Sequence, residues 1–101
     1  MKLLRVEKFK STSFHGVSIS TTVQKLIDLA NKFEIPFESH NDGEDKTNFD
    51  FEFVTEQGVL FTVYDWKIYT PLTMDGVYEF HIGGLNAKDC QTGKDALIKL
   101  L

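Results

Sequence analysis

The chain contains 101 residues, 42% of them hydrophobic, and carries a formal net charge of −4. This length predicts one domain, residues 1–101, and the acidic balance disfavours nonspecific binding to nucleic acid. We expect no membrane span, because no apolar run reaches the roughly 18 residues of a membrane helix. The start lacks the apolar stretch of a signal peptide, and the single cysteine, Cys90, forms no internal disulfide. A reducing, cytoplasmic setting is expected.

The first predicted element is a strand over residues 2–9. Within it, Leu4 and Val6 alternate with charged neighbours, which is typical of a strand with one buried face. Residues 10–15 are rich in serine and threonine and predict a loop. Gly16 then marks a turn.

A helix is predicted next. Thr21 and Gln24 fit a capping box, in which a hydroxyl at the N-cap and a side chain three residues on satisfy each other's backbone donors. Pro36 stops the helix and favours extended geometry just before it. The apolar positions share one helical face, namely Val23, Leu26, Ile27, Ala30 and Phe33.

Residues 38–48 are polar and predict a loop, with a turn signal at Asp42-Gly43. Strict alternation follows and predicts a half-buried strand, with three phenylalanines on one face: Phe49, Phe51 and Phe53. A turn at Gln57-Gly58 joins this strand to a second one over residues 59–66. The pair is a predicted β-hairpin.

A third strand is predicted over residues 77–82, after a connection over residues 69–76. Its inward face carries Tyr78, Phe80 and Ile82, and its polar face carries Glu79 and His81. Gly83-Gly84 is predicted to end the strand. Residues 86–101 are helical in character, although Gly93 weakens the middle and leaves a start at Thr92 open.

The predicted order is strand, helix, three strands, helix. It indicates an α+β fold, with an antiparallel sheet of about four strands and two helices packed on one face. The first strand could pair at either edge, so the strand order stays open. An exposed edge also leaves a homodimer open.

The first candidate site is an acidic stretch with seven carboxylates and one lysine. Its spacing does not match a calcium-binding loop, so no metal is expected. It is either a solvated loop and strand face or a surface that docks on a basic partner. The carboxylates are Glu38, Asp42, Glu44, Asp45, Asp50, Glu52 and Glu56.

Two further candidates contain aromatic and glycine residues. Tyr64 and Trp66 stand at a strand end, where they either anchor a partner or stack on a ligand, or belong to the core. Gly83-Gly84 follows a strand and precedes a helix, where free backbone N–H groups can hold an anion. His81, just before them, could act as an acid, a base or a ligand.

No enzyme signature is present, so we expect a non-enzymatic protein that needs no cofactor. A hydrolase remains the weakest alternative. It would use His81 together with Asp65 or Glu79, since Glu79 and His81 share a strand face.

Several short motifs occur in a fixed order along the chain: Phe14-His15-Gly16, Thr21-Thr22 before Leu26, Phe33 to Pro36, Gly58, Phe61 to Lys67, and Phe80 to Gly84. This order resembles a class of small accessory proteins of tailed bacteriophages, in which a tryptophan often stands where this chain has Phe80. The resemblance spans residues 14–84. It implies the cytoplasm of an infected bacterium and no particular activity, although such proteins often inhibit a host enzyme or a defence system.

The leading hypothesis is an anti-defence or host-directed inhibitor that binds a host or defence protein with a basic surface. Its docking residues would be Asp42, Glu44, Asp45, Asp50, Glu52, Tyr64 and Trp66. The alternative is a protein that sequesters a small ligand, such as a nucleotide signal. The residues for that ligand would be Tyr64, Trp66, Lys67, His81, Gly83 and Gly84.

Overall fold

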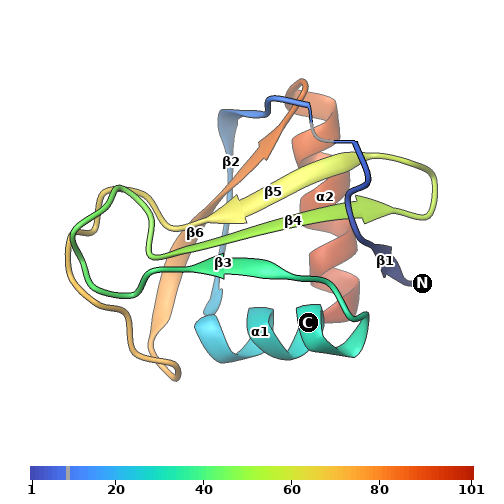
Figure 1. Ribbon diagram of the computed structural model, residues 1–101. Helices are drawn as coiled ribbons and strands as arrows, with labels where there is room; N and C mark the ends of the chain where they lie inside the picture. Colours follow the sequence, from blue (N-terminus) through green and yellow to red (C-terminus); the bar gives the residue numbers. More distant parts are fainter. Residues whose placement is uncertain (9) are drawn as a thin grey trace.

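A computed structural model describes residues 1–8 and 10–101 (Figure 1). It confirms the α+β class and the two helices, but the antiparallel sheet has six strands instead of about four. The elements are β1 (Leu3–Leu4), β2 (Ser13–Thr22), α1 (Val23–Lys32), β3 (Phe37–Ser39), β4 (Phe49–Thr55), β5 (Leu60–Tyr64), β6 (Val77–Gly84) and α2 (Ala87–Leu100).

The strands run in the spatial order β1-β4-β5-β6-β2, and β3 also pairs with β4. Consecutive strands β4, β5 and β6 are neighbours, which confirms the predicted meander. β1 and β3 share one side of β4, where Leu3 pairs with Thr55 and Phe37 with Phe51. β2 comes early in the chain but pairs with β6, so β2 forms the edge of the sheet opposite to β1.

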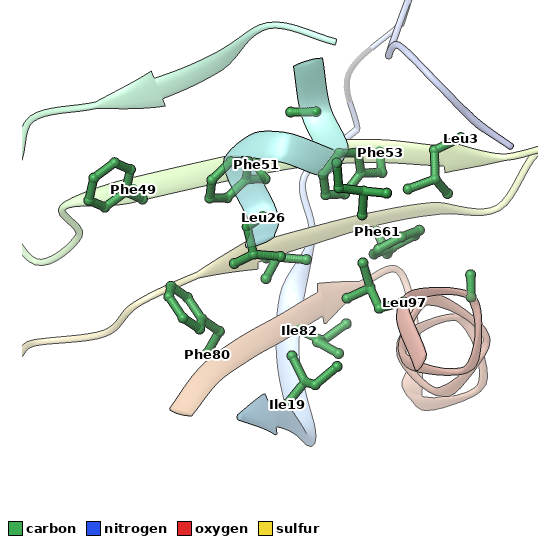
Figure 2. Close-up of a cluster of buried hydrophobic side chains, with 14 of the residues drawn as sticks. Leu3, Ile19, Leu26, Phe49, Phe51, Phe53, Phe61, Phe80, Ile82 and Leu97 are labelled. Atoms are coloured by element: carbon green, nitrogen blue, oxygen red, sulfur yellow. The ribbon is translucent and has the colours of Figure 1, made fainter. Parts of the chain in front are cut away.

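The hydrophobic core lies between one face of the sheet and both helices (Figure 2). The prediction for β4 is confirmed, because Phe49, Phe51 and Phe53 are all buried while the residues between them point to the opposite face. Figure 2 shows Leu26 of α1 near Phe51, and Leu97 of α2 near Phe61 and Ile82. Neither helix covers the opposite face, which we call the open face.

The structure corrects the prediction for the N-terminal segment. The strand predicted over residues 2–9 is only β1, and its buried side chain is Leu3 (2% exposed) rather than Leu4 (39% exposed). Phe9, the predicted end of that strand, lies outside the described residues. Most of the segment predicted as a loop and a turn belongs to β2. Gly16, with φ +81°, sits at a β-bulge where the pairing with β6 shifts register.

The first helix forms as predicted, but its N-cap residue and part of its buried face differ from the prediction. Thr22, not Thr21, is the N-cap, and its hydroxyl accepts a hydrogen bond from the backbone N–H of Lys25. The predicted capping box is therefore wrong; the side chain of Gln24 donates to Asp28 instead. The buried face also includes Leu29, which was not predicted.

Three further boundaries differ from the prediction. The polar loop begins after β3, which takes in Glu38, and Gly83-Gly84 continues β6 instead of ending it. The second helix begins at Ala87, where the side chain of Asn86 caps it by accepting from the N–H of Asp89. Gly93 does not delay the helix. It allows close packing, because a Cβ there would lie 2.5 Å from Cγ of Phe61.

Candidate ligand-binding cleft

Adjacent strands place three polar or aromatic side chains in a row on the open face. Asp50 of β4 pairs with Tyr64 of β5, and Tyr64 pairs with His81 of β6. Side chains of directly paired residues point to the same side of a sheet. The row therefore lies opposite the phenylalanine core and brings together two candidate groups that the sequence kept apart.

Four rings form what we call the aromatic cluster: Phe14, Tyr64, Trp66 and His81. The rings of Phe14 and His81 stack with 3.9 Å between centroids and 14° between planes. The Tyr64 ring meets those of Trp66 and His81 edge-on, with 5.9 and 5.6 Å between ring centroids. Phe14 is 44% exposed and Trp66 41% exposed, so two large apolar rings remain available to a ligand.

A cleft of about 500 Å³ lies among these rings. This volume falls within the roughly 300–1,000 Å³ typical of small-molecule sites. Besides the aromatic cluster, the cleft is lined by Thr12, Ser13, Thr47, Asp50, Glu52 and Thr62. Gly83 lies beneath it, where a Cβ would come within 2.4 Å of the Thr62 hydroxyl oxygen. The Thr62 hydroxyl is also hydrogen-bonded to the Thr12 hydroxyl, with 3.0 Å between the two oxygen atoms.

The acidic side of the cleft holds carboxyl groups in an unfavourable setting. Burial raises the pKa of Asp50 to about 6, with added repulsion from Glu52, Glu38 and Asp65. Within the described part of the chain, Oδ1 of Asp50 is buried and has no hydrogen-bond partner. Burial, and then Glu38, also raises the pKa of Glu52. A ligand with N–H donors or a positive charge would stabilise the charged form of these carboxyl groups.

Two lysines lie over the ring of Trp66. The Nζ atom of Lys46 lies 5.8 Å from the Trp66 ring centroid, and that of Lys67 lies 5.5 Å away. Both distances fit cation–π contact. The cleft thus combines an acidic wall with an aromatic surface flanked by cations.

A buried network fixes the two loops that carry Thr47, Trp66 and the lysines. The fully buried carboxylate of Asp65 accepts from the backbone N–H groups of Asn48 and Phe49, each at 2.8 Å. The Asn48 side chain donates to Asp65 and to the carbonyl of Thr70, both at 3.0 Å. Asp65 therefore points inward and holds the segment from which Tyr64 and Trp66 point outward.

The structure brings together most of the predicted ligand residues and part of the predicted docking residues. Those at or beside the cleft are Asp50, Glu52, Tyr64, Trp66, Lys67, His81 and Gly83. Gly84 faces the core, where a Cβ would lie 2.9 Å from Sγ of Cys90. Asp42, Glu44 and Asp45 do not line the cleft, and the carboxylate of Asp42 accepts from the N–H of Glu44 within the loop.

Two predicted chemistries find no matching geometry. Gly83 and Gly84 pair with β2 on one side and β5 on the other, so they lie inside the sheet and form no open anion-binding turn. Asp65 is engaged in the buried network, and among the described residues no hydrogen bond joins His81 to Asp65 or Glu79. The described part of the chain also contains no group of three or more His, Cys, Asp or Glu side chains that could hold a metal ion.

Five residues that line the cleft were not predicted from the sequence: Thr12, Ser13, Phe14, Thr47 and Thr62. Phe14 reaches His81 only because β2 pairs with β6, and the sequence around Phe14 predicted a loop. The available signal was the motif Phe14-His15-Gly16, which is one of the motifs that carry the resemblance.

Comparison with family models, with curated proteins and with solved structures finds no match to this chain. The relationship to phage accessory proteins therefore stays a prediction. Among the described residues, no helix is both long and apolar enough to cross a membrane.

Proposed function

We propose that this protein binds a small ligand of the nucleotide class in the open-face cleft and sequesters it. The observation that carries the proposal is the aromatic cluster around a cleft of about 500 Å³. Stacking of a base on an aromatic side chain contributes about 1–3 kcal/mol and suits every base. The exposed ring of Trp66 offers such a surface.

The charges around Trp66 support the same class of ligand. Lys46 and Lys67 lie beside this ring and can meet a phosphate group, whose affinity for lysine is largely electrostatic. The carboxylates of Asp50 and Glu52 line the cleft and can accept from the N–H groups of a base. A nucleotide carries a phosphate group at one end and a base with N–H groups at the other.

The resemblance to phage accessory proteins suggests a setting for this binding. In an infected bacterium, capture of a signalling nucleotide would lower its free concentration without any turnover. The anti-defence effect would then depend on the amount of this protein, because it sequesters the nucleotide without degrading it.

The test is isothermal titration calorimetry and thermal unfolding with a panel of nucleoside monophosphates. We expect at least one to raise Tm by about 5 °C or more at one hundred times its Kd. Trp66→Ala should weaken binding at least about tenfold, because a stacking surface is lost. Tyr69→Ala is the matched control, since Tyr69 is 50% exposed and does not line the cleft. Equal affinities of the two variants would contradict the proposal.

A second candidate function is binding to a host or defence protein, as the sequence first indicated. The observation in its favour is that Phe14 and Trp66 are exposed next to acidic side chains, which suits a basic partner. Reversing the charges of several carboxylates of the proposed docking face, Asp42, Glu44, Asp45, Asp50 and Glu52, should then abolish capture of that partner. An unchanged affinity and salt dependence would show that this acidic region is not the docking face.

A further inference from the structure

We infer that Asp50 and Glu52 make the cleft selective for guanine, whose edge presents adjacent N–H donors. This inference rests on the proposed function and specifies which nucleotide the cleft prefers. It assigns to the two carboxylates a role in recognising the base, separate from the stacking role of Trp66.

The first step concerns the unmet hydrogen-bonding capacity of the acidic wall. Asp50 and Glu52 lie two residues apart on β4, point to the open face and line the cleft. Oδ1 of Asp50 is too deeply buried for a ligand to touch, so the acceptors for a ligand are the remaining carboxylate oxygens of Asp50 and Glu52 that line the cleft. Ionised carboxylates only accept hydrogen bonds, so a ligand that brings N–H groups gains more here than one that brings further acceptors.

The second step compares the edges of the four bases. Guanine presents two adjacent donors, N1–H and the N2 amino group, and a carboxylate can accept both at once. Adenine and cytosine each place an acceptor next to their amino group. Uracil places its single N–H between two carbonyl oxygens, which the carboxylates repel. Only guanine therefore meets the acidic wall with a pair of donors.

The third step concerns the rest of the nucleotide. When the base edge meets the acidic wall, the phosphate belongs away from Asp50 and Glu52, where like charges would repel it. Lys46 and Lys67 stand beside Trp66 and supply positive charge there. The base can thus stack on Trp66 with its donor edge toward the carboxylates and its phosphate toward the lysines.

The experiment is calorimetric titration of the full chain with GMP, IMP and AMP at pH 7.5. A good bidentate contact discriminates by about 1–3 kcal/mol, so GMP should bind at least tenfold more tightly than AMP. IMP keeps N1–H but lacks the amino group, and should fall between them. Asp50→Asn and Glu52→Gln should each reduce the GMP preference to below about threefold. Both variants should weaken GMP more than AMP, because adenine offers a single donor group beside an acceptor and so depends less on the carboxylates.

Glu79→Gln is the matched control for Glu52→Gln, because Glu79 is exposed on the open face but does not line the cleft. It should keep the full GMP preference. Equal binding of all three nucleotides would overturn the inference and leave the proposed function standing, whereas no binding of any of them would remove both. Tighter binding of L-arginine than of GMP at the same site would also overturn it. The planar donor pair would then come from a guanidinium group.

Discussion

The carboxyl group of Asp50 is half-buried beside other acidic side chains, and this setting makes the stability of the protein depend on pH. Its pKa rises from 3.8 to about 6, with burial as the largest cause. Between these two values the folded state binds more protons than the unfolded state, so the free energy of unfolding falls as pH rises. The penalty is complete above about pH 6 and absent below about pH 4.

We therefore predict that Asp50→Asn stabilises the protein at neutral pH. The gain in unfolding free energy should be about 1–2 kcal/mol at pH 7.5, because solvent partly screens this half-buried group, and it should vanish near pH 4. Urea unfolding at several pH values measures both quantities. Asp75→Asn, at an exposed position, should show no such trend. A variant that is less stable at pH 7.5 would contradict the assignment.

Asp65 has the opposite effect, because its buried carboxylate satisfies three N–H groups from Asn48 and Phe49. Asp65→Ala should lower the free energy of unfolding by about 3 kcal/mol, since buried donors lose their acceptor. Asp75→Ala on the same loop should change it by less than about 0.5 kcal/mol. Equal losses, measured by urea unfolding at pH 7.5, would show that the network contributes no stability of its own.

At the scale of elements, the strands and helix with clear apolar periodicity could be predicted. The alternation of Phe49, Phe51 and Phe53 predicted β4 and its inward face correctly. β2 was not predicted because its first half is polar and contains the bulge at Gly16, and because Thr21 was interpreted as the start of the helix. Its second half does alternate, with Ile19 and Thr21 buried. β3 is short, and only its pairing with β4 identifies it.

The candidate site was predictable only where it depends on one strand at a time. Tyr64, Trp66 and His81 were singled out from local sequence, and the structure brings them together. Their contact with Phe14 depends on the pairing of β2 with β6, which residues far apart in sequence establish. The separation of Asp42 from Asp50 depends on β3, which places Glu38 rather than the loop beside Asp50.

Helix α2 is placed by a residue that helix propensity disfavours. Gly93→Ala should gain about 1 kcal/mol from propensity but lose more, because a Cβ would lie 2.5 Å from Cγ of the buried Phe61 ring. We expect a net loss of about 1–2 kcal/mol in the free energy of unfolding. Lys88→Ala, at an exposed position of the same helix, should change it by less than 0.5 kcal/mol. A more stable Gly93→Ala would mean that the helix can shift away from Phe61.

On the scale of the whole molecule, one face of the sheet forms the core and the other forms the candidate site. One face, with its phenylalanines and both helices, holds nearly all of the core. The open face carries the cleft, which is lined mainly by half-buried or exposed side chains. Changes to the ligand site such as Trp66→Ala should therefore leave the fold intact, as the binding experiments require.

The pairing of β2 with β6 also determines when this protein can fold. Ser13 pairs with Gly84, so the far edge of the sheet cannot close until the chain has left the ribosome as far as Gly84. The β4–β5 hairpin is local and can form earlier. Pairings this distant in sequence slow folding, and we expect refolding over milliseconds to seconds in stopped-flow experiments rather than the microseconds of small helical proteins. Since the aromatic cluster needs Phe14 beside His81, a nascent chain has no complete cleft until β6 has emerged from the ribosome.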